Sequence, residues 1–128
     1  MRFLSDEWFA FVVEQAAALP ERAGASLVAQ HVIAGVPEVK KLTCTTEFRD
    51  GRLVQCAPGK RADATCSVQW THADALAALR GADLDVAFMR GTLKLDGDYR
   101  TFLLDLRPVF ASAEGAAFLS AVRDATDD

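Results

Sequence analysis

A chain of 128 residues has the length of one domain, which buries about two-thirds of the surface that its unfolded form exposes. Hydrophobic residues make up 51% and charged residues 25%, which excludes a disordered chain, and no apolar run approaches the ~18 residues of a membrane helix. A net charge of -4 argues against nucleic acid as a partner and against strong binding to acidic lipid surfaces, and the lack of a long apolar run argues against stable membrane insertion. No repeat or linker divides the chain, so we expect residues 1–128 to form a single domain.

The N-terminal segment predicts one amphipathic helix that begins after Ser5 and ends before Pro20. Ser5 is a suitable N-cap, and Asp6 and Glu7 follow where the helix dipole favours acidic residues. The same two acids interrupt the apolar core that an export signal needs, so we expect a cytoplasmic protein. Phe11 lies off the apolar face and is interpreted as a singly exposed aromatic residue, with a partner surface as the alternative.

Four β-rich segments follow, and their spacing predicts an antiparallel meander. They cover residues 27–33, 42–48, 53–57 and 64–70. The strongest turn is Asp50-Gly51, because a type I′ hairpin needs positive φ at both central residues. With this two-residue loop, Thr45 would face Cys56, which would place Cys44 and Cys56 on opposite sides of the sheet.

Cysteine and histidine provide no recognisable reactive site. The spacing of Cys44, Cys56 and Cys66 matches neither a zinc site nor a redox pair, so we interpret them as reduced, buried thiols. His31 lies in an apolar strand and is interpreted as a hydrogen-bonded, structural imidazole, whereas His72 is expected at the surface. No nucleophile motif, phosphate loop or metal-ligand series occurs, so we expect no catalytic residues, no metal and no cofactor.

The second half of the chain begins with a helix and an unusual turn-strand-turn segment. A capping box at Thr71 predicts a helix that ends near Gly81. Residues 84–99 then combine an apolar turn, a glycine at position 91, a strand over residues 92–95 and a second turn. This order of elements is the most specific feature of the sequence.

Two further helices are predicted after this segment. The first carries apolar residues at helical spacing and stops at Pro108, and the second is capped by Ser112. The apolar face of the first consists of Tyr99, Phe102, Leu103 and Leu106.

Several segments resemble the sterol carrier protein 2 (SCP2) family. Residues 48–53 resemble the hairpin of that family, Leu79-Arg80-Gly81 resembles the end of its central helix, and residues 87–98 are similar to its most characteristic segment. The resemblance covers about residues 25–110.

The resemblance implies an α/β (α+β) fold in which a twisted, mainly antiparallel five-stranded sheet is covered on one face by helices, with an apolar tunnel between them. It also implies a bacterial-type lipid carrier for fatty acid, fatty acyl-CoA or sterol, which is not an enzyme. By position in the family, the tunnel wall would consist of Phe88, Met89, Leu93, Leu95, Phe102, Leu103, Leu106 and Phe110. If the mouth lies beside this segment, Arg90 or Lys94 would contact a carboxylate or a CoA phosphate; the alternative is a solvated strand face.

Two other functions stay open at this point. A small, cone-shaped enzyme of the ketosteroid isomerase type has this length, and Tyr99 beside Asp98 would supply its oxyanion donor. An accessory domain would act through contacts alone, with Phe11 and the outer sheet face as its partner surface, and a homodimer is left open. Periodicity cannot separate a dry core from a lipid tunnel, because the same residue types line both.

Overall fold

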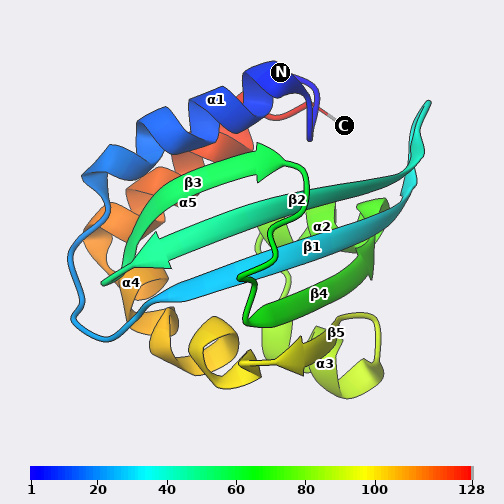
Figure 1. Ribbon diagram of the computed structural model, residues 1–128. Helices are drawn as coiled ribbons and strands as arrows, with labels where there is room; N and C mark the ends of the chain where they lie inside the picture. Colours follow the sequence, from blue (N-terminus) through cyan, green and yellow to red (C-terminus); the bar gives the residue numbers. More distant parts are fainter. Residues whose placement is uncertain (128) are drawn as a thin grey trace.

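The computed structural model describes residues 1–127 and shows a five-stranded sheet with helices behind it and beyond its edges (Figure 1). The strands lie in the order β3-β2-β1-β4-β5. Their bounds are β1 Leu27–Val36, β2 Lys40–Arg49, β3 Arg52–Pro58, β4 Cys66–Thr71 and β5 Lys94–Gly97. The expected α+β architecture is confirmed.

Three of the helices begin at the predicted caps. The hydroxyl oxygens of Ser5, Thr71 and Ser112 accept backbone N–H groups at the starts of α1, α2 and α5. The helix bounds are α1 Asp6–Gln15, α2 His72–Leu79, α3 Leu84–Arg90, α4 Arg107–Ala111 and α5 Ala113–Ala125, with a 3-10 turn at Ala16–Ala18 and a π-helical turn at Thr101–Asp105. None of the helices within residues 1–127 is long and apolar enough to cross a membrane.

The strand connectivity differs from the predicted meander. β1, β2 and β3 are antiparallel neighbours, but β4 pairs parallel to β1, with Ala29 opposite Cys66 and Ile33 opposite Trp70. Residues 59–65 cross the open face of the sheet to reach that position (Figure 1). Arg61 of this crossover donates a hydrogen bond to Glu47 of β2, which holds the crossover against the sheet. Alternation of apolar residues identifies a strand but not its neighbour, which is why this prediction was wrong.

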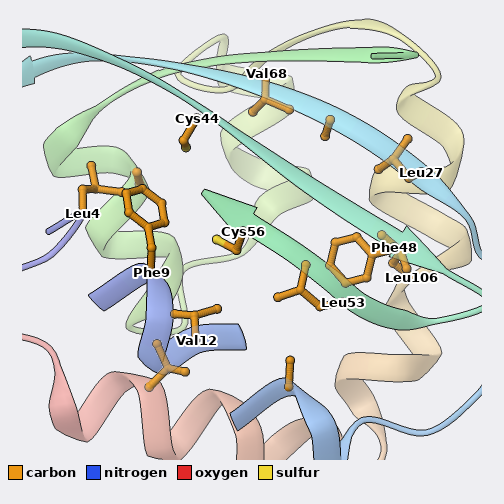
Figure 2. Packing of buried hydrophobic residues seen from close by; sticks show 14 of the residues in the cluster. Leu4, Phe9, Val12, Leu27, Cys44, Phe48, Leu53, Cys56, Val68 and Leu106 are labelled. Carbon is orange, nitrogen blue, oxygen red and sulfur yellow. The ribbon is translucent and has the colours of Figure 1, made fainter. Parts of the chain in front are cut away.

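A bulge in the β2–β3 hairpin changes the predicted register by one residue. Thr46 lies opposite Cys56, and Cys44 lies opposite Pro58, because the register shifts at Glu47 and Phe48. Cys44 and Cys56 therefore lie on the same face of the sheet, not on opposite faces, and both belong to the apolar cluster in Figure 2. All three thiols are free and buried.

The core fills the space between the sheet and the helices. Figure 2 shows Phe9 and Val12 of α1 on the side of the sheet that carries Leu53 and Cys56 of β3. α5 packs closely on α4, since a Cβ atom added to Gly115 would lie 2.7 Å from the Cα of Phe110. This packing fixes α4, which forms one wall of the site described next.

Candidate functional site

A pocket of about 610 Å³ lies between the core-facing side of the sheet and the helices. Its volume is within the range of small-molecule binding sites. The residues that line it come from β1, β2, α2, α3, α4, α5 and the segments between α2 and α3 and around the π-helical turn. They are His31, Thr46, Phe48, Ala78, Ala82, Asp83, Leu84, Asp85, Phe102, Leu103, Leu106, Arg107, Phe110, Ala111 and Leu119.

The floor of the pocket carries two polar side chains from adjacent strands. The Nε2 atom of His31 lies 3.1 Å from the Oγ1 atom of Thr46. The imidazole ring lies between Trp70, on which it stacks, and Phe102, with ring centroids 6.2 Å apart in both cases. Burial lowers the pKa of His31 to about 4, so the ring is neutral near pH 7. The predicted hydrogen-bonded imidazole is confirmed, and it faces the pocket.

Apolar residues of the π-helical turn and α4 form one wall. Phe110 packs edge-to-face on Phe48 of β2, with ring centroids 5.8 Å apart, and Phe48 lies beside Leu106 in Figure 2. Asp98 fixes the start of this segment by accepting hydrogen bonds from the N–H and the hydroxyl of Thr101, at 3.2 and 2.7 Å. The wall is therefore anchored both to the sheet and to the turn before it.

The predicted helix of this wall ends before Pro108. The π-helical turn ends at Asp105, and a separate helix, α4, begins at Arg107. Pro108 lies in the first turn of α4, where its missing N–H costs no intrahelical hydrogen bond. Because these two segments do not form one regular helix, a single 3.6-residue period does not predict that Arg107 lines the pocket.

Three charged residues surround the mouth. The Nη2 atom of Arg107 donates to both carboxylate oxygens of Asp85, at 2.8 and 2.7 Å. Asp83 caps α3, and its Oδ1 atom accepts the N–H groups of Asp85 and Val86 at 2.8 and 3.3 Å. The interior of the pocket is thus apolar with a neutral polar floor, and the charges lie at its rim.

Four of the eight residues predicted to form the wall lie together around this pocket: Phe102, Leu103, Leu106 and Phe110. The other four do not line it. Phe88 and Met89 lie on α3, and their exposed fractions are 38% and 79%. Gly91 ends α3 with a φ of 78°, and the chain then turns so that Leu93 enters the core and Leu95 continues into β5. The predicted apolar turn before Gly91 is a helix.

The two predicted head-group residues also lie outside the pocket lining. Arg90, at the end of α3, and Lys94, on β5, are exposed. The cation at the mouth is Arg107, which does not belong to the apolar face predicted for this part of the chain. His31 and Thr46 were also missed as pocket residues, because no local pattern shows which strand face borders a cavity.

Tyr99 and Asp98, which were considered for an isomerase site, do not lie together in the pocket. Tyr99 stacks on Phe88 outside the pocket, with ring centroids 6.2 Å apart, and Asp98 is bound to Thr101. In the part of the chain that the structure describes, no group of three or more His, Cys, Asp or Glu residues is arranged to hold a metal ion.

Comparison with known proteins gives a family match and several similar folds. The model of the SCP-2 sterol transfer family matches residues 7–109. No curated protein matches the chain. The structure of Sterol Carrier Protein-2 like-3 from Aedes aegypti is similar, with a TM-score of 0.63 and 13% identity over 84% of this chain and 97% of that chain. Palmitated SCP2L2 from Aedes aegypti has a TM-score of 0.57 and 15% identity, over 92% and 94% of the two chains.

Part of a longer enzyme has the same fold. The sec-alkylsulfatase Pisa1 from Pseudomonas sp. is similar, with a TM-score of 0.52 and 21% identity over 90% of this chain. The match covers only 16% of the sulfatase chain. At these identities the solved structures show a shared fold and nothing further about ligands or activity.

Proposed function

Because this chain belongs to the SCP-2 sterol transfer family, we propose that it is a cytoplasmic carrier that binds a fatty acid, a fatty acyl-CoA or a sterol without catalysing a reaction. The observation that carries this proposal is the pocket of about 610 Å³ and its lining of phenylalanine, leucine and alanine side chains. The proposed lipid-contacting residues are Phe102, Leu103, Leu106 and Phe110, together with Phe48 and His31.

Apolar burial alone supplies enough binding energy for a carrier. Each methylene removed from water contributes about 0.8 kcal/mol. Ten buried methylenes would contribute roughly 8 kcal/mol, from which the entropic cost of association is subtracted. A long acyl chain would therefore bind without a dedicated polar site, and it could also be released.

The polar groups of the pocket support a carrier more than an enzyme. An isomerase of the ketosteroid type needs a buried carboxylate base and an acidic donor in the same pocket. Here the carboxylate of Asp83 accepts a backbone N–H at the start of α3, and the carboxylate of Asp85 is paired with Arg107. Tyr99 lies outside the pocket. His31 is neutral and hydrogen-bonded to Thr46.

Two neighbouring alanines of α2 provide a matched test of the pocket. Ala78 is half-buried and lines it, whereas Ala77 is exposed and does not. We expect the delipidated protein and its Ala77→Phe variant to bind cis-parinaric acid or dehydroergosterol saturably, as measured by fluorescence titration. The Ala78→Phe side chain would occupy the space of the ligand and weaken binding at least about tenfold.

Two results would contradict the carrier proposal. One is the absence of saturable binding of both probes to delipidated wild-type protein, and the other is equal binding by the Ala77→Phe and Ala78→Phe variants. Turnover of a Δ5-ketosteroid that is lost in Tyr99→Phe would favour the enzyme instead.

A further inference from the structure

The pocket has a single cationic side chain. Among the lining residues within the described part of the chain, Arg107 alone carries a positive charge, because the His31 ring is neutral near pH 7. The pocket interior is apolar, and an ionised group placed there would lose its hydration without gaining a counter-ion. A charged end of a ligand would therefore stay at the rim, where Arg107 is located.

Arg107 already holds a carboxylate in this structure. Its Nη2 atom donates to both oxygens of Asp85, at 2.8 and 2.7 Å. The two side chains are about half exposed, at 52% for Arg107 and 48% for Asp85. Ion pairs with this much solvent access contribute little net stability, so another carboxylate can replace Asp85 at small cost.

The two partners of this ion pair differ in how firmly they are held. Arg107 begins α4 between Leu106 and Val109, both of which are almost fully buried. Asp85 lies on α3, none of whose residues is buried. The cap that Asp83 provides for α3 does not involve the Asp85 carboxylate. The backbone of Arg107 is thus fixed at the mouth, and Asp85 can leave the guanidinium without disturbing the core.

We propose that Arg107 binds the carboxylate of a long-chain fatty acid, which replaces the Asp85 carboxylate, while the acyl chain runs inward past Phe110 toward His31. This inference rests on the proposed function and identifies the ligand as an anionic amphiphile rather than a neutral sterol. Asp85 acts as an internal competitor for the head-group site.

Two ligands with the same chain and different head groups test this inference. Hexadecanoic acid and hexadecan-1-ol would be titrated at pH 8 into the delipidated protein of residues 1–128 with dehydroergosterol bound. The loss of probe fluorescence then gives the affinity for each compound. We expect Arg107→Gln to lower the affinity for the acid about fivefold and to change the affinity for the alcohol less than about twofold, because only the acid loses a charge-assisted hydrogen bond. Asp85→Asn should raise the affinity for the acid severalfold and leave the affinity for the alcohol unchanged.

Arg90→Gln is the matched control, since it removes the same charge from an exposed arginine outside the pocket. Arg90→Gln should change the affinity for neither ligand. Equal weakening of acid and alcohol by Arg107→Gln would overturn the inference and make the ion pair a purely structural link. Equal weakening of the acid by Arg90→Gln and Arg107→Gln would also overturn it.

If Arg107→Gln folds poorly, the Asp85→Asn variant still tests the inference, because it must raise the affinity for hexadecanoic acid. A wild-type protein that binds the alcohol but shows no response of the acid to either variant contradicts only the head-group assignment. A wild-type protein that binds dehydroergosterol but neither compound also contradicts only this inference. A wild-type protein that binds none of the three contradicts the proposed function itself.

Discussion

His31 and Thr46 form a hydrogen bond across the floor of the pocket, with 3.1 Å between Nε2 and Oγ1, and this bond links β1 to β2. Trp70 and Phe102 contact the imidazole ring, and the exposed fraction of His31 is 9%. Protonation would place a charge in this apolar environment without a carboxylate to balance it. The buried ring therefore couples the stability of the fold to pH.

The first prediction concerns this coupling. The pKa of His31 is about 4 in the folded protein and 6.5 ordinarily, so the unfolded chain binds the proton more tightly. The contribution of His31 to stability is complete above about pH 7, falls as the pH drops through 6.5, and stops changing below about pH 4. We expect a loss of about 2 kcal/mol between pH 7.5 and pH 5, measured by urea unfolding.

The His31→Gln variant separates this effect from the carboxylates, which titrate in both proteins. Glutamine keeps a hydrogen-bonding group toward Thr46 but does not titrate. The difference in unfolding free energy between the two proteins should therefore shrink as the pH falls from 7.5 to 5. A constant difference over that range would show that His31 does not carry the pH dependence.

The second prediction concerns the thiols. Burial raises the pKa of Cys44 and Cys56 to about 12 and that of Cys66 to about 11. Since the thiolate is the reactive species, all three should react slowly with a disulfide reagent such as DTNB at pH 8. We expect full reaction of the three thiols only in denaturant. Rapid modification of one thiol in the folded protein would contradict this burial.

The third prediction concerns Gly115, at the contact between α5 and α4. Replacing glycine by alanine inside a helix ordinarily stabilises it by about 1 kcal/mol. Here the new methyl group would collide with the carbonyl of Val109 and lie 2.7 Å from the Cα of Phe110. We expect Gly115→Ala to destabilise the protein by about 1 to 3 kcal/mol.

Thermal or urea unfolding measures this effect, and fatty acid binding should weaken with it, because α4 carries Phe110 and Arg107 at the pocket. Ala117→Gly, at an exposed position of α5, is the control. It should lower the free energy of unfolding by about 1 kcal/mol and leave the affinity for the fatty acid unchanged. A Gly115→Ala variant that is more stable than wild type would show that the two helices can separate freely.

Local sequence patterns predicted the elements of the fold well but not their pairing. Side-chain caps at Ser5, Thr71 and Ser112 depend on residues within one helical turn, and these were confirmed. The parallel pairing of β4 with β1 joins residues as far apart in the sequence as Ala29 and Cys66, and no local pattern specifies it. The bulge next to Phe48 has no signal in the alternation of its strand.

The sequence predicted pocket residues only where they lie in one continuous segment of the chain. The family resemblance places Phe102 and Phe110 in the wall, the amphipathic pattern includes Phe102, and both residues line the pocket. His31 and Phe48 reach it from two strands whose neighbours the sequence does not reveal. Arg107 reaches it at the start of α4, which is separate from the π-helical turn at Thr101–Asp105, whereas the sequence pattern predicted one regular helix up to Pro108.

The last prediction uses two residues of one segment that the structure places in different environments. Leu93 is 1% exposed in the core, whereas Met89 is 79% exposed on α3. Leu93→Ala should therefore cost about 2 to 5 kcal/mol of unfolding free energy. Met89→Ala should change it by less than about 0.5 kcal/mol.

Ligand binding by the same two variants then tests where the pocket ends. Neither Leu93 nor Met89 lines it, so fatty acid affinity should stay within about twofold of wild type wherever the variant is folded. Circular dichroism establishes the folded range, and fluorescence titration gives the affinity. A tenfold loss in Met89→Ala would mean that α3 folds over the mouth when lipid is bound, since an exposed side chain affects affinity only if the bound state covers it.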